Sequence, residues 1–254
     1  MTDEHEEETI VWSTQDQIAS YLRDKILSGD VPPGGKLPSS RDLTEIFGAA
    51  SQTIRNAVIT IEKEGLAYSR QGLGVIAREH PQRTMEPAKY KNPPTDGGKY
   101  QWIAEAEKKG STGKSELLKV EEAVPPVAVR AALDLDEEGT ALLRQQVLFL
   151  DGKPCELVDV WIPIDLARGT AMMQHRKIRG GAGRVLREAG FPPIRCVDKV
   201  SARWPTPEQA KALKLPTKLP VLRTFRVTYS NDDRPIQVEV MAKAGHLYEL
   251  QYEF

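Results

Sequence analysis

The chain has 254 residues, 28% of which are charged, and a formal net charge of -1 at pH 7. This length suits one large domain or two modest ones, and the near-neutral charge excludes a protein that attracts nucleic acid through its overall field. Any affinity for DNA must therefore come from a local patch of basic side chains.

The two cysteines and four histidines limit the chemistry that the chain can support. Cys155 and Cys196 are too few for a disulfide framework, which favours a reducing cytoplasm. The histidines show no ligand spacing, so we expect no metal site and no cofactor.

An acidic segment precedes the first expected helix, and we interpret residues 1–12 as a solvated acidic tail rather than a signal peptide. No run of about 18 apolar residues follows, so we expect no membrane partner. Ser13 then suits the cap of a helix that carries Ile18, Leu22 and Ile26 on one stripe and ends at Gly29.

Residues 39–64 predict two helices joined by a tight turn. Ser39 can cap the first helix with help from Asp42, and Gly48 can end it. We expect Leu43, Ile46 and Phe47 to lie on its apolar face.

Ser51 is expected to cap the second helix of the pair, and Gly65 to end it. Ile54, Val58 and Ile61 recur at helical spacing on a buried face. The opposite face begins with polar residues, which fits either the reading helix of a helix-turn-helix or an ordinary helical hairpin.

The residues after this helix favour the DNA-reading alternative. Leu66–Tyr68 and Val75–Ala77 predict two strands around a glycine-bearing turn. A hairpin directly after a reading helix is a wing. We expect the basic patch to come from arginines that share one face, namely Arg41, Arg55, Arg70 and Arg78.

The segment QIASYLRDKILSGDVPPGGKLPSSRDLTEIFGAASQTIRNAVITIEKEGLAYSRQGLGVIA, Gln17 to Ala77, resembles the winged-helix DNA-binding domain of the GntR family of bacterial transcription regulators. The specific motifs are G-x-x-x-P-G-x-x-L-P-S-x-R-x-L, S-x-x-T-x-R-x-A, E-x-x-G-L and R-x-G-x-G. The resemblance implies a reading edge at the start of the second helix, a phosphate or base contact from Arg41, and a wing tip in the minor groove. The implied DNA-binding residues are Ser39, Arg41, Ser51, Gln52, Thr53, Arg55, Arg70, Gln71, Gly72 and Gly74.

We assign the winged-helix domain to residues 13–78. The amino-acid composition changes after it. Residues 79–99 contain four prolines and Gly97-Gly98, so we interpret them as a linker to a second domain at 100–254.

The sequence of the second domain predicts a mixture of helices and strands. The expected elements are helices at 101–109, from 127 and at 184–189, and strands at 116–121, 141–149, 155–161 and 195–204. A helix-hairpin unit recurs about eighty residues later, since Ala132–Leu135 corresponds to Ala212–Leu215 and Asp151–Pro154 to Asp232–Pro235. Two such units predict an antiparallel sheet with helices on one side, an α+β fold.

The runs LLRQQVLFLDGKP and VLRTFRVTYSNDDRPIQVE resemble the two core hairpins of the UTRA effector domain. This domain shares its fold with chorismate lyase and defines the HutC subfamily of GntR regulators. The resemblance implies dimerisation and a small-molecule pocket lined by Arg144, Glu156, Arg226 and Glu239. Arginine suits an anionic effector, although cross-strand ion pairs such as Arg226 with Glu239 fit the same residues.

These features predict a homodimeric repressor that binds palindromic double-stranded operator DNA and is released by a small-molecule effector. The alternative is a chorismate lyase-like enzyme domain that carries a DNA-binding module. No nucleophile-base pair or paired carboxylates emerge from the sequence, so we assign no catalytic residue and expect no enzyme.

Overall fold

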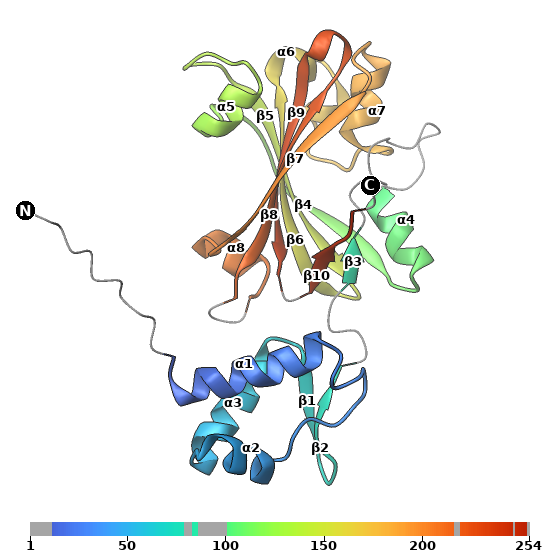
Figure 1. The fold of residues 1–254 in the computed structure, drawn as a ribbon. Helices are drawn as coiled ribbons and strands as arrows, with labels where there is room; N and C mark the ends of the chain where they lie inside the picture. The colour runs from blue at the N-terminus through green and yellow to red at the C-terminus, as the bar shows by residue number, and fades with distance from the viewer. Residues whose placement is uncertain (1–11, 79–82, 86–100, 216–218, 246, 253–254) are drawn as a thin grey trace, which may run out of the picture. The chain divides into compact units, whose positions relative to one another are not determined.

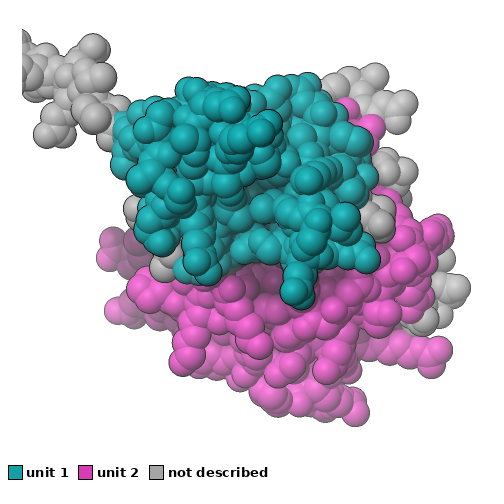
Figure 2. All heavy atoms as spheres, turned by 90° about the horizontal axis from the view of Figure 1, so that it is seen from below, with its two compact units in different colours: residues 1–83 teal, residues 84–254 magenta. Residues whose placement is uncertain are grey.

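The computed structural model describes residues 12–78, 83–85, 101–215, 219–245 and 247–252. The chain forms two compact units, residues 1–83 and 84–254 (Figure 2). Among the described residues, no helix combines the length and the apolar character that crossing a bilayer requires. The predicted acidic tail and most of the predicted linker lie outside the described residues.

The first unit has the predicted helix-turn-helix and wing (Figure 1). Its helices are α1 (Thr14–Leu27), α2 (Ser40–Phe47) and α3 (Ser51–Lys63), and the wing strands are β1 (Ala67–Arg70) and β2 (Gly74–Ala77). The helices and the hairpin thus follow one another in the predicted order.

The cap of α2 is as predicted, whereas the cap of α3 is not. The Ser39 hydroxyl accepts the Asp42 N–H at 3.2 Å, and the Asp42 carboxylate accepts the Ser39 N–H at 2.8 Å. The expectation that Ser51 caps α3 is wrong, because Ala50 already holds the extended cap conformation and its carbonyl accepts the Ile54 N–H. Ser51 is therefore the first residue of the helix.

One predicted core position of α2 is also wrong. Leu43 is buried and Phe47 packs against the same core, but the Ile46 side chain is 53% exposed. A short helix buries only a narrow stripe, and Ile46 lies at its margin.

The core of the first unit joins α3 to α1. Ile54, Ala57 and Ile61 of α3 pack in one buried cluster with Leu22 and Ile26 of α1. Because α3 buries this stripe, its opposite stripe faces outward.

An ion pair connects α1 to the carboxy-terminal cap of α3. The Arg23 guanidinium donates two hydrogen bonds to the Glu64 carboxylate, from Nε at 2.8 Å and from Nη2 at 2.6 Å. The Glu64 side chain is only 7% exposed, so its charge depends on this partner.

The second unit contains a sheet in which six strands run antiparallel to their neighbours (Figure 1). In spatial order the strands are β4 (Gly113–Ala123), β5 (Ala141–Leu150), β6 (Lys153–Pro163), β9 (Pro235–Ala244), β8 (Val221–Tyr229) and β7 (Arg195–Arg203). The pairing of β6 with β9 joins the two halves of the sheet.

The two halves repeat a longer unit than the sequence predicted. β4, α5 (Val127–Ala132), β5 and β6 correspond to β7, α8 (Pro207–Ala212), β8 and β9. Asp134 and Lys214 follow the two helices with the same left-handed backbone, at φ of +54° and +49°. The helix-hairpin unit therefore appears twice, each time with an edge strand before it.

The prediction that helices cover one side of the sheet is only half right. α5 and α8 pack on one face with Trp161, Phe225 and Leu157. The opposite face packs against a cluster that includes Leu166, Met172 and Leu186. These residues come from α6 (Ile164–Ala167), η2 (Ala171–Met173) and α7 (Gly181–Glu188).

Four further elements complete the part of the chain that the structure describes. α4 (Gln101–Lys108) follows the predicted boundary, and its Trp102 joins the core. β3 (Arg83–Met85) pairs with β10 (Tyr248–Leu250), so residues 83–85 of the predicted linker form a strand. A 3₁₀ turn, η3 (Asn231–Asp233), connects β8 to β9.

The Arg23–Glu64 pair provides a test of how the first unit is stabilised. Replacement Arg23→Met leaves a buried carboxylate without its partner and should lower the free energy of unfolding by about 1–3 kcal/mol. The double variant Arg23→Met/Glu64→Leu should recover most of this loss. Urea unfolding followed by circular dichroism measures both.

Lys25→Met is the matched control, because it removes the same charge from the exposed Lys25–Asp30 pair on the same helix. It should leave unfolding near that of the wild type. An Arg23→Met variant as stable as the Lys25→Met variant would contradict a structural role for the Arg23–Glu64 pair.

Candidate nucleic-acid interface and effector site

The start of α3 presents a polar edge on the surface. Ser51, Gln52 and Arg55 are exposed, and Thr53 is half-buried. They surround the amino-terminal end of the helix, where unpaired main-chain N–H groups can also meet phosphate oxygens. The edge can therefore offer hydroxyl, amide and guanidinium donors to a DNA groove.

α2 adds a second basic contact. The Arg41 side chain is 86% exposed, and its Nε lies 3.7 Å from the Glu45 carboxylate one turn along the helix. Ser39 is already engaged in the cap, and the hydrogen bond from its main-chain N–H lowers the pKa of the Asp42 carboxyl. Arg41 is thus free to reorient, whereas Ser39 is fixed.

The wing tip is exposed from Arg70 through Gly74. Gly72 and Gly74 have φ of +77° and +94°, a conformation that other residues rarely adopt. A Cβ on Gly74 would lie 3.1 Å from Cε of Lys36, so the glycine leaves room for this lysine.

Lys36 is a basic residue that the sequence analysis missed. It bridges to Ile76 in the second wing strand, and Leu37 N–H donates to the Val75 carbonyl at 2.8 Å. The loop before α2 therefore forms a third strand-like edge of the wing. No local pattern marks Lys36, because the contact joins residues forty positions apart.

The four arginines expected to share a basic face differ in their surroundings. Arg41, Arg55 and Arg70 are exposed, but the Arg78 guanidinium lies 5.8 Å from the centre of the Tyr68 ring and is half-buried. This stacking holds Arg78 against the wing, which reduces its freedom to follow a DNA backbone.

The four residues predicted for an effector pocket lie on one face of the six-stranded sheet. The register pairs Arg144 with Val160, Val160 with Glu239, Glu239 with Arg226, and Arg226 with Asp198. Directly paired residues of an antiparallel sheet point to the same side. The backbones of Arg144 and Arg226 are therefore three strand spacings apart, roughly 14 Å.

Arg144 is buried at 7% exposure and is held by the main chain. Its guanidinium donates to the carbonyls of Met172, Gln174 and Arg176. Burial lowers the pKa of Arg144, and no carboxylate lies within ion-pair distance of it among the described residues. The partners of this guanidinium in the described part of the chain are therefore main-chain carbonyl oxygens.

The other predicted residues have charged partners on neighbouring strands. Arg226 donates from Nε and Nη2 to the Asp198 carboxylate, both at 2.7 Å, so the ion pair is with Asp198 and not with Glu239. Glu156 lies 3.1 Å from Lys243 Nζ. Burial raises the pKa of the Glu239 carboxyl despite the nearby Arg226.

Asp198 and Lys243 are the partners that sequence reasoning missed. Both are identified only by the register of distant strands, since Asp198 opposes Arg226 and Lys243 opposes Glu156. The resulting face carries several buried charges close together, which is unusual for a protein core and suits a polar ligand.

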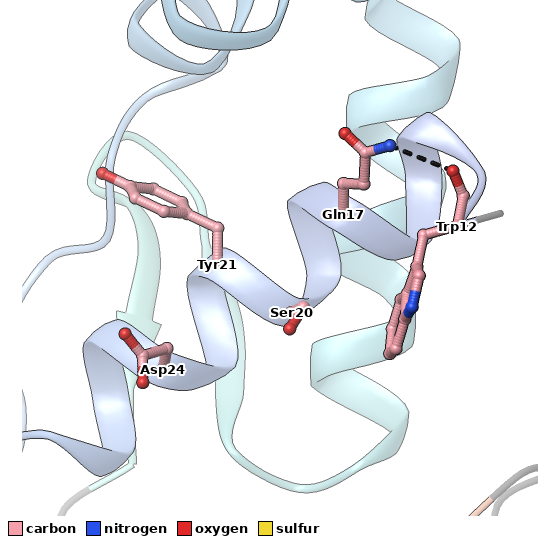
Figure 3. Close-up of a pocket in the computed structure, with 5 residues that line it drawn as sticks. All are labelled: Trp12, Gln17, Ser20, Tyr21 and Asp24. Carbon is pink, nitrogen blue, oxygen red and sulfur yellow. Dashed lines mark hydrogen bonds between the residues drawn. The ribbon is translucent and has the colours of Figure 1, made fainter. Parts of the chain in front are cut away.

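A shallow hollow of about 410 Å³ lies on the outer side of α1 (Figure 3). It is lined by Trp12, Gln17, Ser20, Tyr21 and Asp24. The Gln17 amide donates to the Trp12 carbonyl at 3.0 Å across one end. The walls come from a single helix and the residues before it, so the hollow is a surface depression.

Metal-binding residue types are dispersed in the part of the chain that the structure describes. No group of three or more His, Cys, Asp and Glu side chains there could hold a metal ion. Cys155 is buried and Cys196 half-buried, and the two do not form a disulfide.

Two family models match this chain. The UTRA domain model matches residues 108–249, and the model of bacterial regulatory proteins of the gntR family matches residues 14–76. The UTRA match covers more than half of the chain, and the gntR match coincides with the helix-turn-helix and its wing.

Several curated relatives match over nearly the whole length. The HTH-type regulator SCO4628 of Streptomyces coelicolor is 26% identical, over 94% of this chain and 91% of its own. GgaR of Escherichia coli K12 is 24% identical, over 91% and 87%. The transcriptional repressor NagR of Bacillus subtilis is 25% identical, over 84% and 83%.

The fold is similar to those of solved regulators. PhnF of Mycobacterium smegmatis superposes with a TM-score of 0.59 at 20% identity, over 93% of this chain and 98% of PhnF. A crystal structure of another GntR-family regulator gives a TM-score of 0.62 at 21% identity, over 95% and 97%. The chain is a DNA-binding transcriptional regulator that belongs to the GntR family and carries a UTRA domain.

Proposed function

We propose that this regulator is a homodimeric repressor of the HutC subfamily, which binds a palindromic operator in the cytoplasm and releases it when an effector binds. The observation that carries the proposal is the exposed polar edge of α3 beside an exposed wing tip. The buried stripe of the same helix holds this edge outward. Arg55 and the wing arginine Arg70 supply the local positive charge that the whole chain lacks.

A dimer follows from the needs of DNA recognition. One winged helix reads a short half-site, whereas two copies related by a two-fold axis read a palindrome with useful specificity. The name of NagR as a repressor, at 25% identity over most of both chains, supports the choice of repression over activation.

The charged face of the sheet is our proposed effector site. Arg144 carries a buried positive charge with carbonyl partners and no carboxylate partner among the described residues, so a bound anion would stabilise it. Glu239, whose carboxyl pKa is raised by burial, adds a further polar group to the same face. Arg226 already donates two hydrogen bonds to Asp198, so we place the anionic group of the effector at Arg144.

Effector release needs only a difference in affinity. Suppose that the effector binds a second arrangement of the two units more tightly than the DNA-bound arrangement. At saturation it then lowers operator affinity by up to the ratio of its affinities for the two arrangements. A lyase-like enzyme is not favoured, since the relatives described above are named as transcriptional regulators.

Arg55→Ala tests the DNA-binding edge. The variant loses a guanidinium at the proposed groove contact and should raise the Kd for palindromic DNA from upstream of the regulator's own gene cluster at least about tenfold. An electrophoretic mobility shift assay at fixed salt measures this change.

Lys108→Ala is the charge-matched control, because Lys108 is exposed on α4 in the second unit. Its Kd should equal that of the wild type. Equal affinity of Arg55→Ala and Lys108→Ala would remove the start of α3 from the interface.

The effector site is tested with anionic metabolites. We expect a sugar phosphate or carboxylate that raises the Tm of the protein also to release operator DNA. Arg144→Gln should need at least about tenfold more of that compound for half-maximal release, because the anion loses its charged partner. Equal sensitivity of the variant and the wild type would place the anion elsewhere.

A further inference from the structure

Asn56 lies on α3 next to the proposed DNA-reading edge, and the family resemblance assigns it no contact. It is one helical turn beyond Gln52, so both side chains project from the same stripe. Gln52 is exposed and Asn56 half-buried, whereas Ile54 and Ala57 between and beside them are buried.

The two amides are joined by a hydrogen bond. Nε2 of Gln52 donates to Oδ1 of Asn56 at 2.9 Å. This bond uses one of the two Nε2 hydrogens, so the second hydrogen and Oε1 of Gln52 remain for another partner. In this arrangement the nitrogen of the Gln52 amide lies toward Asn56.

A fixed amide edge matches one base in the major groove. Adenine presents the N7 acceptor beside the N6 donor, which pair with an amide N–H and an amide oxygen. Guanine presents two acceptors at the same positions, so the amide oxygen would face O6 without a hydrogen between them. An amide edge held with its N–H toward N7 and its oxygen toward N6 therefore matches adenine and not guanine.

Orientation of a free glutamine is costly. Fixing a glutamine side chain costs conformational entropy, and an unrestrained amide can also rotate to exchange its donor and acceptor. A bond to a neighbour on the same helix meets part of this cost before DNA arrives.

We propose that Asn56 is a positioning residue that orients the Gln52 amide to read adenine in each operator half-site. The inference rests on the proposed operator binding and adds to it the base and the residue that fixes the preference. Asn56 acts through its Oδ1 acceptor, so a residue with an acceptor at this place preserves the effect.

The test compares Asn56→Leu with Asn56→Asp in the full chain. Leucine keeps the approximate size and favours helix, but it removes the acceptor. Aspartate keeps the acceptor and adds a charge that repels phosphate. Both variants and the wild type are used to select sequences from a randomised DNA library, and Gln52→Ala identifies the operator position that depends on Gln52.

We expect the wild type to select adenine at that position. Asn56→Leu should reduce the preference for adenine at this position at least about fivefold, with the other positions unchanged. Asn56→Asp should keep the preference while binding every sequence more weakly. Glu62→Ala, farther along α3, is the control and should behave as the wild type.

The outcomes separate this inference from the proposed function. An unchanged adenine preference in Asn56→Leu, or another base at the Gln52-dependent position, overturns the inference alone. Failure of the wild-type protein to select any palindrome overturns the proposed operator binding and the inference together.

Discussion

The packing of one stripe of α3 against α1 determines what the first unit can do. Ile54, Ala57 and Ile61 bury the inner side of the helix, and the period of 3.6 residues then leaves Gln52 and Arg55 on the outer side. The wing is held beside this edge through main-chain bonds to the loop before α2. Recognition by this unit is thus a geometric result of how its small core forms.

In the second unit, one face of the sheet buries charged side chains, and these need partners. Three of the charged residues on this face, Arg226, Glu156 and Lys243, are satisfied by partners on adjacent strands. Arg144 instead donates hydrogen bonds to main-chain carbonyls of the segment around η2. A ligand that neutralised this guanidinium would compete for those contacts, and so would act on the segment that Arg144 holds.

Local signals predicted the elements of both units well. The Ser39–Asp42 cap, Gly48 and the alternating strands each depend on residues within a few positions of one another. The errors have physical causes. Ala50 took the cap expected of Ser51 because the turn ended one residue earlier. The partners of Arg226 and Glu156 depend on strand register between distant parts of the chain, which no local pattern encodes.

In the six-stranded sheet the three strands of one repeat mirror the three strands of the other. This order affects how the second unit folds. Each repeat can form its own three-stranded sheet from neighbouring segments, but it then exposes the inner edge of β6 or of β9. When β6 pairs with β9, Glu156 must come to lie opposite Lys243, which is distant from it in the sequence. Contacts of such long range form late and slowly, so we expect the half-sheets to collapse first and their docking to limit the folding rate.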